Sequence, residues 1–266
     1  MTIVRTAKDS KDRNNPKYCR IAHDFRALND KIQADPEPVD SVADMMAWMS
    51  MDPTGLFFKT DVDRWFYQIM CADDDGGEAI NSTCFELFRR LWVSSIMLFG
   101  QKNGPAMFKR NAVIMQEELL REGKTKSYFD DIIGKTGKND FQGLRLIWRR
   151  LLELAGTHGW KLKPAKTKWG FEVIETVGFK WSPQGVDMGQ KNKDAVQGLV
   201  FPRNKSELRG LLGLANQFRE RIAGYALLVS ALTALVRGPE RTVVPTPEAL
   251  LEFENLKVVL GSARAL

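Results

Sequence analysis

Two neighbouring aspartates, Asp130 and Asp131, lie between an aromatic pair and an aliphatic pair in the stretch from Tyr128 to Ile133. Apolar residues on both sides of an Asp-Asp pair predict two short strands joined by a tight turn. Such a turn would push both carboxylates out of the hairpin tip, where they could meet a cation. Taken alone, the pattern fits a solvated surface hairpin more often than a metal site.

A second apolar run that ends on a carboxylate changes this balance. Residues 55–62 predict a buried strand that delivers Asp61 at its end, and a further apolar stretch begins at Phe66. A single aspartate at the end of a strand is usually a helix cap. Carboxylates from two such sites together could hold a divalent metal ion, because Mg²⁺ prefers oxygen ligands.

Composition excludes several other classes of protein. The 266 residues suffice for one large domain or for two to three subdomains. No run of 18 apolar residues predicts a membrane span, and the N-terminus has no apolar segment typical of a secretory signal. Three cysteines without Cys-x-x-Cys spacing indicate reduced thiols inside the cell. Only His23 and His158 are available, so a histidine metal centre or a Ser-His-Asp triad has little support.

Positive charge is concentrated in one part of the chain. The net charge is +6, and residues 160–222 contain 12 Lys and Arg against 6 Asp and Glu, which is an excess of 12 − 6 = 6. A basic half beside a nearly neutral half suggests a surface that faces a polyanion. On charge alone, a solvated lysine-rich surface is an equally good interpretation.

Periodicity predicts mixed helix and strand up to about residue 188 and helices alone after it. The expected helices of the first part are 39–51, 104–123 and 139–158, the last capped by Asn139. The expected strands, besides those already named, are 85–96, 160–163, 172–174 and 177–181. The later helices are 191–199, 204–222, 225–236 and 246–260, with a capping box formed by Asn204 and Glu207. The expected class is therefore α+β.

The order of these motifs resembles the reverse transcriptase of gypsy-type LTR retrotransposons and, more distantly, of retroviruses. The resemblance covers almost the whole chain. It rests on RIAHDFRALN in the fingers, FKTDVDRWFYQI and LFGQKNGPAMFKR in the palm, the YxDD-like hairpin, and the later segments GWKLKPAKTK, VGFKWSPQG and LRGLLGLANQFRER.

This resemblance implies a right-hand polymerase fold with fingers, palm and helical thumb. The implied fingers are 1–56 and 70–96, the palm 57–69 and 97–188, the thumb 189–240, and 241–266 would begin a connection toward an RNase H region. The implied activity is RNA- or DNA-templated addition of deoxynucleotides to a primer 3′-OH. The implied partners are dNTP and a primer–template duplex of RNA or DNA.

The resemblance also assigns site residues. Asp61, Asp130 and Asp131 would be catalytic and would bind two Mg²⁺ or Mn²⁺ ions. The incoming dNTP would contact Arg20, Val62, Phe66, Phe99 and Gly100, with Phe66 as a steric gate against a 2′-OH. One of Lys11, Arg13 and Lys17 would help Arg20 to clamp the triphosphate. The duplex phosphates would contact Lys161, Lys163, Lys166, Arg203, Lys205 and Arg209.

Three positions depart from the family pattern and keep alternatives open. Trp65 stands where Gly or Ala is usual, and Leu98 where Pro is usual. Lys126-Ser127 replace an aliphatic lead-in to the Asp-Asp hairpin, so the strand that they begin is expected to be poorly buried. The short segment before the fingers motif suggests a piece of a larger Pol polyprotein, located in a cytoplasmic particle or the nucleus. The alternative functions are a catalytically decayed nucleic-acid-binding module and a two-metal nuclease. A nuclease would leave Phe66 and Arg20 without a role.

Overall fold

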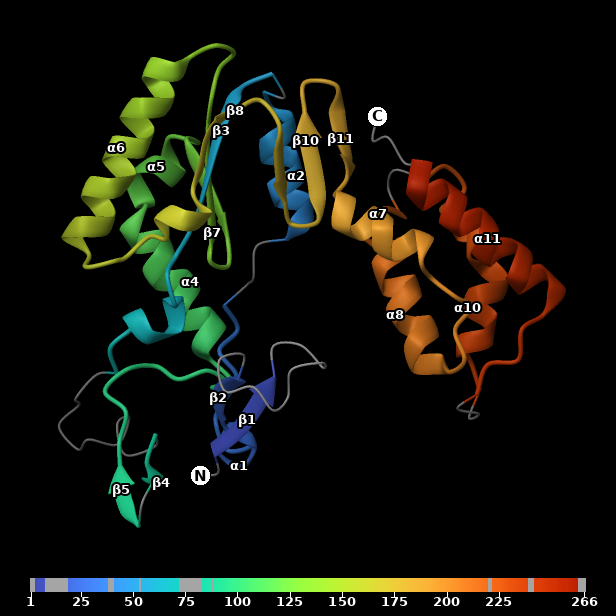
Figure 1. Cartoon of the computed structure of the whole chain (residues 1–266), viewed down its shortest axis with the longest axis horizontal. Coiled ribbons are helices and arrows are strands. Elements are labelled where there is room, and N and C mark those ends of the chain that lie inside the picture. Colours follow the sequence, from blue (N-terminus) through green and yellow to red (C-terminus); the bar gives the residue numbers. More distant parts are fainter. Residues whose placement is uncertain are drawn as a thin grey trace. The chain divides into compact units, whose positions relative to one another are not determined.

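The computed structural model describes residues 3–7, 19–37, 41–52, 54–71, 83–87, 89–219, 222–238 and 242–262. The chain divides into two compact units, which are described separately below. The first contains residues 1–48 and 56–171, and the second contains residues 49–55 and 172–266 (Figure 1). The expected Lys11, Arg13 and Lys17 lie outside the described residues.

A four-stranded antiparallel sheet forms the centre of the first unit. Its strands are β3 (Leu56–Asp61), β6 (Thr125–Tyr128), β7 (Asp131–Thr136) and β8 (Lys168–Phe171), in the order β6-β7-β3-β8. Strand β3 has a neighbour on each side and five of its six residues are buried, which explains its continuous apolar run. The predicted buried strand ending at Asp61 is therefore confirmed.

Two expectations about this sheet are wrong. Residues 160–163, all within the described part, contain only an isolated bridge from Leu162 to Val62, and the strand beside β3 is β8 instead. The lead-in to the Asp-Asp hairpin is not poorly buried, because Thr125 and Ser127 both point inward from β6. Side-chain alternation places Lys126 on the opposite face of the strand, where a charged residue is tolerated.

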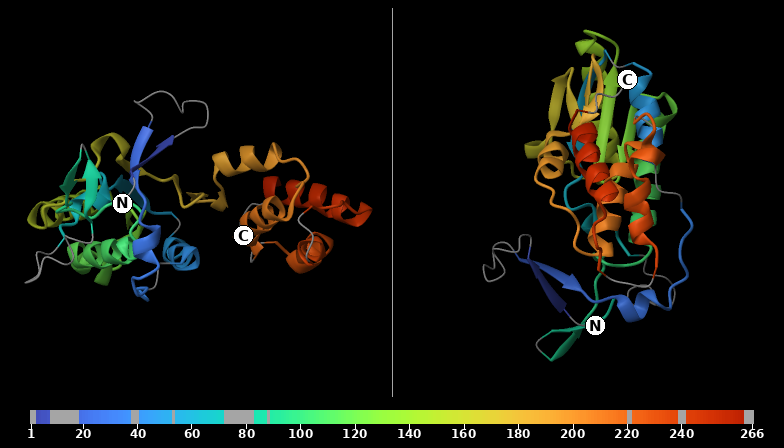
Figure 2. Two further views of the ribbon diagram at one scale, coloured as in Figure 1. Left: turned by 90° about the horizontal axis from the view of Figure 1, so that it is seen from below. Right: turned by 90° about the vertical axis from the view of Figure 1, so that its right-hand side faces the viewer.

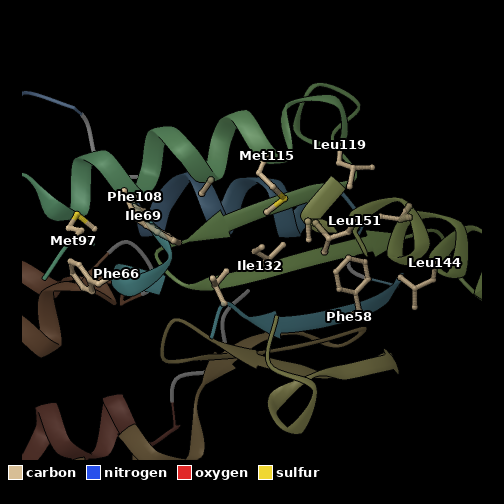
Figure 3. Packing of buried hydrophobic residues seen from close by; sticks show 14 of the residues in the cluster. Phe58, Phe66, Ile69, Met97, Phe108, Met115, Leu119, Ile132, Leu144 and Leu151 are labelled. Atoms are coloured by element: carbon tan, nitrogen blue, oxygen red, sulfur yellow. The ribbon is translucent and has the colours of Figure 1, made fainter. Parts of the chain in front are cut away.

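Helices α4 (Gly104–Met115), α5 (Glu117–Arg121) and α6 (Phe141–Thr157) contribute to one core with the sheet. Figure 3 shows Met115 and Leu119 pointing from α4 and α5 toward the sheet, and Leu144 and Leu151 of α6 close to Phe58. The single helix expected over 104–123 is wrong, since the chain breaks at Gln116. Met115 and Leu119, on either side of the break, are both buried in the core.

The N-cap of α6 is Asp140 rather than the expected Asn139. Oδ1 of Asp140 accepts a hydrogen bond of 2.7 Å from the backbone N–H of Gly143. Asn139 instead adopts a positive φ of 59°, a conformation that asparagine tolerates better than most residues. A Cβ at Gly143 would lie 2.0 Å from the Asp140 carboxylate, so this cap requires glycine there.

Smaller elements complete the first unit. Strands β1 (Ile3–Ala7) and β2 (Cys19–His23) pair antiparallel, and α1 (Arg26–Asn29) follows. Helix α2 spans Val42–Ser50, and η3 (Trp65–Gln68) and η4 (Pro164–Lys166) are short 3-10 helices. The strand predicted over 85–96 is a hairpin of β4 (Phe85–Leu87) and β5 (Arg90–Trp92), because the chain turns at Arg89 with a φ of 58°.

The second unit joins a small sheet to a group of helices. Its antiparallel strands are β9 (Ile174–Thr176), β10 (Phe179–Ser182) and β11 (Gly185–Met188). Its helices are α7 (Gln190–Gln197), α8 (Lys205–Asn216), α9 (Tyr225–Leu228), α10 (Ser230–Val236) and α11 (Pro247–Ser262). Figure 2 shows α8, α10 and α11 side by side. The predicted cap at Asn204 is confirmed, since its side chain accepts from the N–H of Glu207 at 2.9 Å, while the Glu207 carboxylate accepts from the N–H of Arg203 at 2.8 Å.

Strands β9–β11 group with the helices that follow rather than with the central sheet. Helix α11 packs against α7 and α10 and buries Ala249, Phe253, Leu256 and Leu260, so residues 247–262 are part of the helical group. The boundaries expected for fingers, palm, thumb and connection stay predictions. The mixed α+β class is confirmed. No helix within the described ranges is long and apolar enough to cross a membrane.

Candidate active site

Asp61 and the Asp130 hairpin meet because β3 and β7 pair antiparallel. The last residue of β3, Asp61, is the register partner of Asp131, the first residue of β7. The pairing continues beyond the strand, where the N–H of Val62 donates to the carbonyl of Asp130 at 2.9 Å. Sequence-remote carboxylates therefore converge at one end of the central sheet.

The two hairpin aspartates occupy different positions. The turn consists of Phe129 and Asp130, and Phe129 has a φ of 49°. Asp131 lies in β7 opposite Tyr128, so the expectation that both carboxylates protrude from the tip is wrong. Of the two aspartates, only Asp130 lies in the turn itself.

Asp130 shares a common electrostatic environment with Asp61. Burial raises the pKa of Asp130, and the negative charge of Asp61 raises it further, with a smaller contribution from Asp131. Asp61 itself is only 6% exposed. A buried carboxylate and a half-buried one that repel each other favour a positive charge between or beside them.

Two lysines supply positive charge at this point. Nζ of Lys166 lies 2.9 Å from Oδ2 of Asp61, and Nζ of Lys59 lies 2.7 Å from Oδ2 of Asp131. Lys166 was expected among the residues that contact duplex phosphates, but its ammonium is paired with the Asp61 carboxylate. The hydrogen bond to Asp61 raises the pKa of Lys166, so the lysine stays charged.

Sequence reasoning did not identify Lys59. It lies two residues before Asp61 on the same strand, and period-2 alternation places both side chains on one face. This spacing was a usable signal. No comparable local signal exists for Lys166, which is 105 residues from Asp61.

The chain segment around Lys161 and Lys163 lines the same end of β3. The N–H of Lys163 donates to the carbonyl of Asp61 at 2.8 Å, and the N–H of Asp63 donates to the carbonyl of Lys161 at 2.9 Å. Gln68, another residue that the sequence did not single out, accepts from the N–H of Lys161 at 2.7 Å and donates to its carbonyl at 3.1 Å. Both lysines are thus held beside the carboxylates by backbone bonds.

The expected nucleotide contacts are more enclosed than predicted. The ring of Phe66 is 7% exposed and belongs to the core (Figure 3). Its centroid lies 3.4 Å from that of Trp65 and 4.1 Å from that of Phe99. A Cβ at Gly104 would approach the Phe66 ring to 2.9 Å, so the glycine admits the ring to its site. The steric-gate role of Phe66 stays a prediction.

The other expected nucleotide contacts surround this aromatic group. Val62 is buried at 1% exposure, which restricts any contact with a nucleotide to its main chain. Gly100 has a φ of +100°, a conformation that favours glycine. Arg20 lies in β2 opposite Thr6, and its side chain is outside the described part of the chain.

In the second unit the predicted phosphate contacts separate into two kinds. Arg203 and Arg209 are exposed, as contact with a polyanion requires. Lys205 is only 6% exposed, and its Nζ donates to the carbonyls of Arg237 and Gly238, the latter at 2.9 Å. Lys205 therefore caps the end of α10, and its contact with duplex phosphates stays a prediction.

The donor set fits a divalent cation only in part. Asp61 and Asp130 supply oxygen ligands whose repulsion a cation would relieve. Within the described residues, no three His, Cys, Asp or Glu side chains form a ready metal cluster, and Asp131 is paired with Lys59. Asp61 and Asp130 are accordingly stronger candidates for metal binding than Asp131 is.

The fold is the polymerase fold seen in reverse transcriptase structures. The structure aligns over 99% of this chain with a foamy viral protease-reverse transcriptase in complex with double-stranded DNA, at a TM-score of 0.84, 19% identity and 44% coverage of that chain. A foamy viral protease-reverse transcriptase in complex with an RNA/DNA hybrid aligns over 95% of this chain and 33% of its own, at a TM-score of 0.78 and 19% identity.

The sequence relatives are Pol polyproteins of retrotransposons, which confirms the resemblance stated from the motifs. The retrovirus-related Pol polyprotein from transposon opus of Drosophila melanogaster is 27% identical over 95% of this chain. The one from transposon gypsy of the same species is 26% identical over 84%. The chain spans 25% and 21% of these relatives' lengths, about a quarter of each. No protein-family model matches the chain.

Proposed function

We propose that this chain is the reverse transcriptase part of a Pol-type polyprotein. It transfers deoxynucleotidyl groups from dNTP to a primer 3′-OH, copying an RNA or a DNA template. The observation that carries the proposal is the convergence of Asp61 and Asp130 at the end of β3 and β7, where burial and the charge of Asp61 raise the pKa of Asp130. The likeness of the fold to reverse transcriptases supports the same activity.

Asp61 and Asp130 would hold the divalent ions, with Asp131 as a supporting carboxylate. Two bound Mg²⁺ or Mn²⁺ ions supply the positive charge that activates the primer hydroxyl and stabilises the leaving pyrophosphate. The side chain of Lys166 is 55% exposed. It can turn from Asp61 to the triphosphate, where an ammonium stabilises developing phosphoryl charge.

The phosphates of a primer–template duplex are proposed to contact basic residues of the first unit and, separately, basic residues of the second. Lys161 and Lys163 are held beside the carboxylates, and Arg203 and Arg209 are exposed on or near α8. Contacts of this type bind phosphates without reading sequence, so affinity should fall steeply with salt. The similar structures were determined with double-stranded DNA and with an RNA/DNA hybrid, which supports a duplex partner.

Primer extension tests this function directly. Wild-type protein, Mg²⁺, a primer–template duplex and labelled dNTP should give extended primer, and Asp130→Asn should reduce the rate by about a thousandfold. Asp63→Asn is the matched control, because Asp63 lies two residues from Asp61 but its carboxylate is 38% exposed and pairs with Lys163 at 3.8 Å. No extension by the wild-type protein, beside an active control polymerase, contradicts the proposal.

A catalytically decayed nucleic-acid-binding module is the second candidate. It is favoured by one observation, the stacking of Trp65 on a buried Phe66 where the sugar of a nucleotide would lie. This candidate predicts duplex binding that survives Asp130→Asn, with no incorporation at any concentration of Mg²⁺ or Mn²⁺. The same extension experiment therefore separates the two functions.

A further inference from the structure

The side chain of Asn29 joins the fingers to the palm loop that contains Gly100. Its Nδ2 donates to the carbonyl of Gly100 at 2.8 Å, and its Oδ1 accepts from the N–H of Lys102 at 2.9 Å. One amide group thus fixes two peptide units of the loop that are two residues apart. These partners are 71 and 73 residues away in sequence.

The loop has a conformation that needs such support. Gly100 has a φ of +100°, and a Cβ there would lie 3.4 Å from the Phe25 ring and 3.5 Å from the carbonyl of His23. The residues that approach Gly100 most closely, like Asn29, therefore come from the fingers motif. Packing against Phe25 and His23 sets how closely the loop approaches the fingers motif. The amide of Asn29 sets the orientation of the peptide planes in the loop.

Asn29 is itself held in place. It is the last residue of α1, and Nζ of Lys102 donates to the carbonyl of Asn29 at 3.3 Å and to that of Ile32 at 3.0 Å. The ammonium of Lys102 satisfies carbonyls at the end of α1, where a positive charge is favourable. The contacts between Asn29 and Lys102 are reciprocal, so the helix end and the loop fix each other.

We propose that Asn29 is a positioning residue for the incoming nucleotide, acting through the backbone of Gly100. This inference rests on the proposed polymerase function, in which Gly100 lets the backbone approach the dNTP. Without the amide of Asn29 the loop would populate other peptide orientations. A nucleotide would then bind only the competent fraction, and its apparent affinity would fall in proportion.

Asn103 provides a matched control in the same junction. Its Nδ2 donates to the carbonyl of Gln33 at 3.0 Å, and its Oδ1 accepts from the N–H of Asp35 at 3.0 Å. Asn29 and Asn103 each make two side-chain bonds to the backbone across the same two segments, and both are partly buried. Only Asn29 bonds the loop at Gly100.

The experiment compares steady-state primer extension by wild type, Asn29→Ala, Asn29→Asp and Asn103→Ala, using one matching dNTP. Asn29→Ala should raise the KM for dNTP by about tenfold and leave kcat within about twofold, as expected for two lost hydrogen bonds remote from the reacting atoms. Asn29→Asp should raise KM at least as much, because a carboxylate oxygen would face the Gly100 carbonyl. Asn103→Ala should leave KM unchanged.

Hydrogen exchange of the Lys102 amide gives a second measurement that needs no catalysis. Exchange should accelerate in Asn29→Ala and not in Asn103→Ala. If wild type extends primers but the two alanine variants share one KM, the inference is overturned and the polymerase function stands. If wild type extends no primer, the proposed function fails and the inference fails with it.

Discussion

The ammonium of Lys166 lies 2.9 Å from Oδ2 of Asp61, although the two residues are 105 positions apart in the sequence. The carboxylate side chain is 9% exposed, whereas the lysine side chain is 55% exposed. A buried aspartate next to a second carboxylate is unfavourable without a cation. The ammonium of Lys166 is that cation within the protein. Because its side chain is exposed, it can move away from Asp61 when another cation binds there.

Replacing this lysine should make the protein depend on divalent metal for stability. Lys166→Met should lower the free energy of unfolding by about 1 kcal/mol in EDTA, since the pair is only partly buried. Mg²⁺ should then stabilise the variant more than wild type, because the ion no longer competes with an ammonium for Asp61. Urea unfolding with and without Mg²⁺ measures both effects.

Lys168→Met is the control for this prediction. Lys168 is an exposed lysine of β8, two residues further along the chain. It should behave as wild type under both conditions. An equal response to Mg²⁺ in Lys166→Met and wild type would show that the lysine and the ion do not share a site.

Lys205 should matter for folding rather than for binding nucleic acid. Its buried ammonium donates to the carbonyls of Arg237 and Gly238. Lys205→Met should therefore cost about 2 kcal/mol in urea unfolding, since two carbonyls lose a charged partner. Arg209→Ala, on the exposed side of α8, should leave stability nearly unchanged but weaken duplex binding at low salt. If Lys205→Met instead weakened duplex binding more than Arg209→Ala and left stability nearly unchanged, Lys205 would be a phosphate contact.

Glu252 of α11 should make stability depend on pH. Its carboxylate accepts from Oγ of Ser230 at 2.7 Å and from the N–H groups of Ala231 and Leu232 at 3.0 Å each, at the start of α10. Burial alone would raise the pKa of Glu252, but these hydrogen bonds outweigh it and lower the pKa below its ordinary value of 4.5. A lowered carboxyl pKa stabilises the folded state above the unfolded pKa.

This contribution should disappear in acid. Near neutral pH, the free energy of unfolding of wild type should exceed that of Glu252→Gln by about 1 kcal/mol, which is comparable to the contribution of a helix cap. The difference should shrink as the pH falls below 4.5 and through the folded pKa, where Glu252 takes up a proton. Unfolding followed against pH measures it. Glu254→Gln, whose carboxylate is 65% exposed, should show no such trend.

The cap of α6 gives a prediction that tests the corrected helix start. Asp140→Ala should lower the unfolding free energy by about 1 kcal/mol, because the N–H of Gly143 loses its acceptor. Asn139→Gly should be neutral or slightly stabilising, since its φ of 59° suits glycine. Thermal unfolding of both variants decides between the two positions. A larger loss of unfolding free energy in Asn139→Gly than in Asp140→Ala would show that Asn139 is the N-cap.

Several features of the fold could be predicted because their causes are local. The apolar run before Asp61 predicted β3, and the residues around Asp130 and Asp131 predicted a hairpin. The cap formed by Asn204 and Glu207 was correct, since its atoms are three residues apart. The capping error at Asn139 was one of a single residue, because both Asn and Asp are good caps.

The features that the sequence did not reveal depend on residues remote in sequence. Strand β8 was missed because its alternation is weak and its place beside β3 comes from pairing across the sheet. The room that Gly104 leaves for the Phe66 ring in the core could not be predicted. The same holds for the hydrogen bonds of Lys205, because the carbonyls that it caps lie 32 and 33 residues away.

By itself, the sequence determined which residue types occur at the ends of strands, where the hairpin turns, and the order of motifs that marks a reverse transcriptase. The tertiary structure alone decided which charges meet, namely Lys166 with Asp61, Lys59 with Asp131, and Lys205 with helix carbonyls. Local patterns follow from backbone geometry within a few residues. Electrostatic partners are chosen by strand pairing and burial, which bring together groups separated by as many as 105 residues.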